Sequence, residues 1–245
     1  YTIRLTPAKD HPTPYLISVQ SAGDRSLLHE EEPNDDPAHA YPLDLTQPMA
    51  GSFPDGHTDI DVFKFTISDT LSAQQWNVTA IPSTGANFEL CLLNAKGDSL
   101  QCRQGAAPSL ADLVLQPGDY FVSFRNRDNT AADYTLQFEE NGEPATATES
   151  EPNDQVTLAS PMSAENAIQG RFAGEEDDYL RFTVPGPAQL WRVQAAGEGV
   201  AYVSLVQVDG NEDARATATP DGRARIDDVY LLPGDHFLRI HGTDG

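Results

Sequence analysis

Short segments of this chain alternate between apolar and polar residues. Residues 63–67 read Phe-Lys-Phe-Thr-Ile, and residues 180–184 read Leu-Arg-Phe-Thr-Val. Apolar residues also recur at every second position in 76–80 and in 88–92. Because successive side chains of a β-strand point to opposite faces, a period of two predicts strands with one buried face.

Turn sequences separate these segments. Pro-Gly-Asp occurs at 117–119 and again at 233–235, where proline restricts φ and glycine accepts a positive φ before a new strand. The chain contains 18 glycines and 18 prolines, a composition that favours turns over long helices. These features predict an all-β fold of antiparallel β-sandwich or jelly-roll modules.

The sequence repeats itself. Glu-Pro-Asn-Asp at 32–35 recurs at 151–154, and residues 115–121 match 231–237 at Leu, Pro, Gly, Asp and Phe. Matches that keep their order indicate a duplicated module. We therefore expect two tandem modules in a fragment of a longer repeat protein. The expected boundaries are the last strand of a preceding module plus a linker in 1–28, a first module in 29–140, a linker in 141–148, and a second module in 149–245.

Four motifs in this order resemble the bacterial pre-peptidase C-terminal domain. They are Glu-Pro-Asn-Asp, a later Gly-x-Phe, Asp-x-Asp before an alternating Phe strand, and a closing Pro-Gly-Asp-Tyr-Phe. The resemblance covers residues 30–140 and 149–245. It implies β-sandwich modules appended to secreted peptidases and other extracellular proteins, with the collagen-binding domain of clostridial collagenases as a calcium-binding relative. It therefore implies a non-catalytic accessory or spacer module of a bacterial protein that is secreted, periplasmic or on the cell surface.

Acidic residues gather at two matching places in each module. Calcium takes six to eight oxygen ligands, usually including several carboxylates from different segments, and the resemblance points to the same two regions. Glu176 departs from the pattern, because it stands where the first module has Asp59. The expected calcium ligands are Glu30, Glu32, Asn34, Asp35, Asp59 and Asp61 in the first module, and Glu149, Glu151, Asn153, Asp154, Glu176, Asp177 and Asp178 in the second.

Two other interpretations of these acids remain open. Asn34 and Asp35 could cap a turn while the other acids face solvent. An acidic surface could also be an adaptation to high salt, which predicts evenly scattered acids. Recurrence at two matching points favours calcium.

The net charge is −23, from 38 acidic and 15 basic residues. This charge argues against nucleic acid or an anionic membrane as a partner. The sequence has no run of 18 apolar residues, so it predicts no membrane insertion. The expected partners are other domains of the parent chain, and extracellular polysaccharide or protein.

The two cysteines, Cys91 and Cys102, flank a predicted turn at 94–99. If Lys96 and Gly97 centre the turn, the cysteines face each other across a hairpin at a separation that a disulfide could close. A disulfide favours an oxidising compartment. Two reduced thiols are the alternative.

The sequence contains none of the common catalytic motifs, such as Gly-x-Ser-x-Gly or His-Glu-x-x-His. His57 lies among acids in a loop, where an exposed side chain is the simpler interpretation. Asp177 and Asp178 could perform acid-base chemistry, although metal binding explains their placement better. We therefore expect no enzyme activity.

The alternative function is recognition of polysaccharide or collagen through exposed aromatic side chains. The repeat of Trp76 at Trp191 favours core packing for both. The candidate contacts on a sheet face are Tyr41, Phe121, Tyr134 and Phe237.

The second module has no sequence counterpart of residues 134–138, Tyr-Thr-Leu-Gln-Phe. The segment Tyr1–Thr6 alternates in the same way. A sandwich that lacks an edge strand exposes unpaired backbone groups and is prone to strand addition. We expect Tyr1–Thr6 of a neighbouring molecule, or of the same one, to fill this gap.

Overall fold

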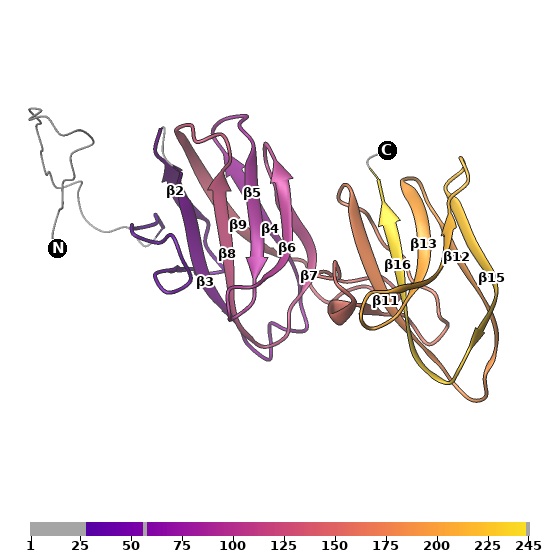
Figure 1. Ribbon diagram of the computed structural model, residues 1–245. Helices are drawn as coiled ribbons and strands as arrows, with labels where there is room; N and C mark the ends of the chain where they lie inside the picture. The colour runs from indigo at the N-terminus through magenta and orange to yellow at the C-terminus, as the bar shows by residue number, and fades with distance from the viewer. Residues whose placement is uncertain (1–27, 56–57, 244–245) are drawn as a thin grey trace, which may run out of the picture.

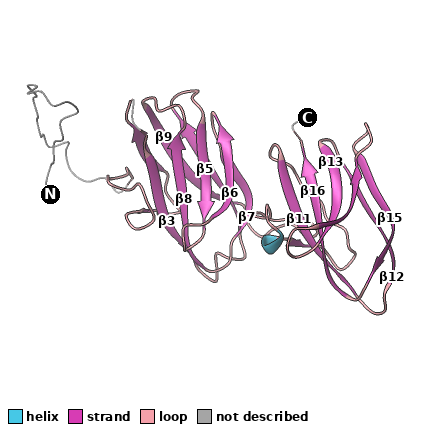
Figure 2. Ribbon diagram, in the orientation of Figure 1, coloured by secondary structure: helices cyan, strands magenta, loops and turns pink. Residues whose placement is uncertain are grey.

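The computed structural model describes residues 28–55 and 58–243, and it consists almost entirely of β-strands arranged as two sandwiches in tandem (Figures 1 and 2). The predicted all-β sandwich fold is confirmed. The expectations for residues 1–27, including Tyr1–Thr6, and for His57 concern positions outside the described residues. In the described part, no helix has the length and apolar character that a membrane crossing requires.

Two facing sheets form the first module. One sheet has the strand order β1-β3-β8-β5-β6, and the other has the order β2-β9-β4-β7. Apart from the parallel pairing of β1 with β3, the pairs are antiparallel. The strands are β1 (Tyr41–Pro42), β2 (Met49–Phe53), β3 (Ile60–Ile67), β4 (Gln75–Pro82), β5 (Phe88–Leu93), β6 (Ser99–Gly105), β7 (Ser109–Val114), β8 (Gly118–Asn126) and β9 (Ala132–Glu140).

Alternate side chains of both sheets fill the core of the first module. Phe63, Phe88 and Phe124 are fully buried. The rings of Phe53, Phe124 and Tyr134 pack together, with centroids 4.8–5.4 Å apart. Aromatic pairs at such distances add stability beyond the burial of apolar area. The period of two in the sequence therefore corresponds to the inward face of each strand.

The second module repeats the larger sheet but not the smaller one. Its five-stranded order β10-β11-β16-β13-β14 matches β1-β3-β8-β5-β6, whereas its second sheet has only β12 and β15. No described residue forms a strand in the place of β9, and residues 168–172, which match β2, form only an isolated bridge. The elements are β10 (Ser160–Pro161), β11 (Glu176–Val184), β12 (Gln189–Ala196), β13 (Val200–Val206), β14 (Glu212–Thr217), β15 (Arg223–Leu231), β16 (Gly234–Gly242) and a short 3-10 helix η1 (Val156–Leu158).

Backbone hydrogen bonds join the two modules directly. Glu151 N donates to Asp112 O at 3.0 Å, and Glu151 O accepts from Val114 N at 2.7 Å, so Glu151 extends the β7 edge of the first module. Two residues earlier, Glu149 N donates to Gln169 O of the second module at 2.8 Å. The predicted linker 141–148 therefore ends at a segment that both modules hold.

A disulfide joins Cys91 on β5 to Cys102 on β6, where the two residues lie directly opposite in the strand register. Their Cα atoms are 4.1 Å apart. The turn between them is closed by a hydrogen bond from Gly97 N to Asn94 O, and Gly97 has a positive φ of 85°. The second module has no cysteine in its β13–β14 hairpin.

Reduction of this disulfide is expected to destabilise the first module by about 3 kcal/mol, because the bond closes a short loop and restricts the unfolded chain. The second module should unfold at the same denaturant concentration with or without reductant. Urea titrations followed by near-UV absorbance of both modules test this difference. An unfolding profile that reductant leaves unchanged would contradict the prediction.

Candidate metal centre

One backbone hydrogen bond in each module brings the acidic opening segment to the start of a core strand. Asn34 O accepts from Val62 N on β3 at 2.9 Å, and Asn153 O accepts from Tyr179 N on β11 at 3.0 Å. Successive residues of a strand alternate between its two faces. Asp61 and Asp178, which directly precede the two donors, are buried and point inward toward the opening segments.

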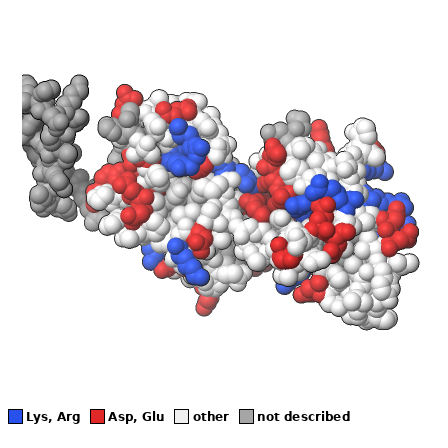
Figure 3. All heavy atoms as spheres, in the orientation of Figure 1, with Lys and Arg blue, Asp and Glu red and all other residues white. Residues whose placement is uncertain are grey.

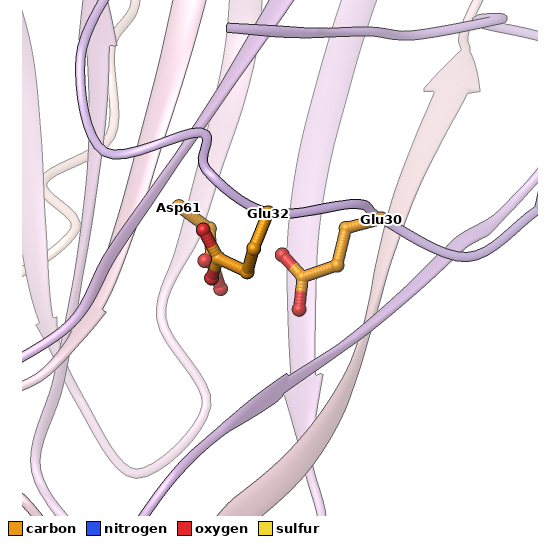
Figure 4. A group of neighbouring side chains, drawn as sticks. All are labelled: Glu30, Glu32 and Asp61. Carbon is orange, nitrogen blue, oxygen red and sulfur yellow. The ribbon is translucent and has the colours of Figure 1, made fainter. Parts of the chain in front are cut away.

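In the first module, carboxylate oxygens converge in two overlapping sets. Glu30, Glu32 and Asp61 each offer an oxygen, and these atoms lie within 4.8 Å of one another. Figure 4 shows the three side chains pointing toward one another. Glu32 also belongs to a more exposed set with Asp35 and Asp59. The structure thus brings together the five carboxylates predicted for this module.

Buried polar oxygens in this cluster lack hydrogen-bond partners. Asn34 and Asp61 have exposures of 0%, yet the Oδ1 atom of each accepts no hydrogen bond. The other oxygens are occupied: Asn34 Nδ2 and the hydroxyl of Tyr134 both donate to Glu30 Oε2 at 3.0 Å, and the same hydroxyl donates to Asp61 Oδ2. An unpaired buried acceptor is costly. A bound cation would satisfy both free oxygens.

Burial makes ionisation of these acids unfavourable. It raises the pKa of Asp61 to about 9, with the charge of Glu30 as the next largest cause. Burial, partly offset by the hydrogen bond from Asn34 N, raises the pKa of Glu32, and burial together with Asp35 raises the pKa of Asp59. A divalent cation among them would favour the charged forms instead.

The second module repeats this arrangement with one substitution. Oxygens of Glu151, Glu176 and Asp178 lie within 4.8 Å of one another, and all three residues are buried. The Oδ1 atoms of Asn153, Asp154 and Asp178 accept no hydrogen bond. Burial is the largest cause that raises the pKa of Glu151 to about 7 and that of Asp178 to about 8.

Two expected ligands of the second module lie outside its set of converging oxygens. Asp177 points away from the cluster, because it alternates with Asp178 on β11, and it faces His241 Nδ1 at 2.9 Å. Glu149 lies at the edge of the cluster, since its carboxylate accepts from Arg171 N at 2.7 Å and from Asn153 Nδ2 at 3.3 Å. Asp177 and Glu149 are therefore not among the converging oxygens of Glu151, Glu176 and Asp178, and their assignment as ligands stays a prediction.

An arginine of the first module contacts the second cluster, which the sequence analysis did not anticipate. Arg103 on β6 pairs with Glu176, and its Nη1 lies 3.6 Å from Asp154 Oδ2. On the face shown in Figure 3, basic and acidic side chains adjoin where the modules meet. Nothing in the sequence near Arg103 indicates this contact, because it depends on how the modules pack.

The structure gives the burial of the aromatic side chains that were considered as contacts for polysaccharide or collagen. Tyr41, Phe121 and Tyr134 are buried, so they are not exposed contacts for a polysaccharide or protein. Phe237 and Trp191 are partly buried, and Trp76 is buried as expected. The recognition hypothesis therefore loses three of its four candidate residues.

The metal-free protein is expected to lose stability as the pH rises from about 5 to about 9. The folded-state pKa of Asp61 is about 9 and that of Asp178 is about 8, and both exceed the ordinary value. The folded protein therefore retains protons that the unfolded chain has released, and rising pH favours unfolding. Calorimetry in a chelator should show a falling Tm. A Tm that stays constant or rises over this range would contradict the prediction.

No protein-family model matches the sequence, and no curated protein sequence matches it. One solved structure with similarity is the pre-peptidase C-terminal domain of a Bacillus anthracis collagenase, at 18% identity and a TM-score of 0.36, over 45% of this chain and 100% of that domain. Another is a Bifidobacterium dentium β-glucuronidase complexed with coumarin-3-O-glucuronide, at 11% identity and a TM-score of 0.23, over 70% of this chain and 33% of that one.

A third solved structure is the PBSX exported protein XepA, at 10% identity and a TM-score of 0.28, over 79% of this chain and 84% of that one. At these values the similarities do not assign a function to the chain.

Proposed function

We propose that this chain is a non-catalytic accessory or spacer segment of a secreted bacterial protein, in which calcium stabilises each β-sandwich at the end where the chain enters it. The observation that carries the proposal is the recurrence, in both modules, of a buried carboxylate cluster beside asparagine and aspartate oxygens that have no hydrogen-bond partner.

The donor chemistry favours calcium over other ions. The converging atoms are carboxylate oxygens from two chain segments, with an asparagine Oδ1 beside them, and no cysteine or histidine belongs to the described clusters. Calcium accepts six to eight oxygens in flexible geometry, whereas magnesium prefers a strict octahedron and retains several waters. Asn34 and Asn153 would supply amide oxygens to the respective ions.

The position of the second cluster supports a role in joining modules. Glu151 belongs to the cluster of the second module and also pairs through its backbone with β7 of the first. A cation held by Glu151 would order the residue that connects the modules. Removal of calcium should therefore loosen the junction before it unfolds the cores.

Metal-stripped protein should release or absorb heat when calcium is titrated into it, and its Tm should rise at about 1 mM calcium because the ion binds only the folded state. Magnesium at the same concentration is the control and should raise Tm much less. Calcium that produces neither a binding heat nor a change in Tm would refute the proposed sites.

A further inference from the structure

A groove of about 970 Å³ crosses the second module between residues 168–172 and β12. Its floor is apolar and includes Leu180, Val193, Val203 and Leu238. These four residues belong to the hydrophobic core of the second module. The groove therefore opens onto the core.

The same space in the first module holds the strand β9. That strand pairs with β2 on one side and with β4 on the other. It buries Tyr134 and Leu136 against the core, with exposures of 3% and 1%. Among the described residues, β12, which matches β4, pairs only with β15. The groove thus has the place and the unpaired edge of a strand site.

We propose that residues 1–5, Tyr-Thr-Ile-Arg-Leu, of a second copy of this chain occupy the groove as an antiparallel strand between β12 and residues 168–172. Their sequence aligns without a gap with residues 134–138 of β9, Tyr-Thr-Leu-Gln-Phe. Tyr, Ile and Leu would face the core, while Thr and Arg would face solvent. Strand addition of this kind combines backbone hydrogen bonds with pockets for alternate side chains.

The tyrosine is the residue that best identifies the occupant. In the first module the Tyr134 hydroxyl donates to Glu30 and Asp61, and its ring lies against Gly51, where a Cβ atom would overlap it. The second module retains the matching residues, and all three line the groove: Glu149, Asp178 and Gly170.

The second-module residues are arranged to accept a hydroxyl. In the first module Tyr134 reaches Oδ2 of Asp61, and Oδ1 stays unpaired; Asp178, whose Oδ1 is likewise unpaired, can receive a hydroxyl on Oδ2 in the same way. The carboxylate of Glu149 lies over Gly170, where the first module has the tyrosine ring. This carboxylate is the end of a flexible side chain. Tyr1 would displace it from Gly170 and place its hydroxyl within hydrogen-bonding distance of Asp178 and Glu149.

The path of the chain favours a second copy as the donor. Leu28 O accepts from Ala50 N on β2, which is one edge of its sheet, whereas Glu151 of the second module pairs at β7, the opposite edge. Residues 1–5 of the same molecule would have to cross the first module to reach the groove. Donation of residues 1–5 to a second copy is head-to-tail. It leaves an unfilled groove at one end of the assembly and unpaired residues 1–5 at the other.

Fluorescence anisotropy with a labelled peptide of residues 1–6 tests the groove. The acceptor is the protein lacking residues 1–6, measured both in a chelator and in calcium so that the outcome does not depend on the proposed metal sites. The peptide should bind, the Tyr1→Phe peptide should bind about tenfold more weakly through loss of a buried hydrogen bond, and a Thr2→Ser peptide should bind like the parent. Equal binding of a scrambled peptide, or of the Tyr1→Phe peptide, would overturn the assignment.

Sedimentation velocity over a range of protein concentrations tests the donor. The chain of residues 1–245 should form dimers and longer species as concentration rises, and the protein lacking residues 1–6 should remain monomeric. Excess free peptide should return the 1–245 chain to monomers. A 1–245 chain that stays monomeric, or a shortened protein that assembles equally, would overturn donation by a second copy.

Discussion

Replacement of Asp61 by asparagine is expected to have opposite effects on stability and on metal binding. Without calcium the variant should be more stable than the wild type at pH 8, because burial and Glu30 disfavour a charge at this position. A gain of 1 kcal/mol corresponds to a rise in Tm of about 4–8 °C for a module of this size. With calcium the variant should bind about 100-fold more weakly, because one of the proposed carboxylate ligands of the first module is lost.

Calorimetric Tm values in a chelator and titration with calcium measure the two effects on the same variant. Asp178→Asn is the matched change in the second module and should behave in the same way there. Asp69→Asn removes an exposed acid and should alter neither quantity. A purely structural role for Asp61 predicts instead that the variant loses stability in both conditions and keeps any calcium affinity.

Replacement of Arg103 by glutamine should increase the calcium affinity of the second module by about tenfold. The guanidinium of Arg103 contacts Glu176 and lies 3.6 Å from Asp154, so it repels an incoming cation. At a separation of about 5 Å, repulsion between one and two charges is about 1.7 kcal/mol even at the dielectric constant of water, and burial increases it, so tenfold is the smallest effect expected. The same reasoning predicts that the wild-type second module binds calcium more weakly than the first.

Calcium titration in an Asp61→Asn background isolates the second module, and small-angle X-ray scattering reports on the junction. Arg103→Gln should broaden the distribution of distances between modules in the metal-free protein. Arg171→Gln is the control, since it removes the ion pair with Asp112 across the junction and leaves the carboxylates of Glu151, Glu176 and Asp178 untouched. An unchanged affinity in Arg103→Gln would show that the arginine does not compete with the ion.

The sequence predicted the parts of this molecule that depend on local pattern. The apolar residues of the alternating segment 63–67 form the buried face of β3, and the turn around Gly97 places Cys91 opposite Cys102. The acidic residues at the start of each core strand converge with the opening segments, because a backbone hydrogen bond from the strand to Asn34 O or Asn153 O brings the two together.

Contacts between distant residues were beyond sequence reasoning. Asp177 was grouped with Asp178, although neighbours on a strand face opposite ways. Tyr134 was considered as an exposed contact, yet its hydroxyl reaches Glu30 and Asp61 across the core. Arg103 comes from the other module, so only the packing of the two sandwiches reveals it.

The junction has a consequence for how far an array of such modules can extend. Glu151 is bonded to the first module and Glu149 to the second, so Ser150 alone lies between them, and Ser150 N itself donates to Ser160 of the second module. A flexible linker lets end-to-end distance grow only with the square root of its length. Where each junction holds its direction, the distance between the ends of the array grows in proportion to the number of modules. Every added module would then carry a terminal domain farther from its point of attachment by nearly a full module length.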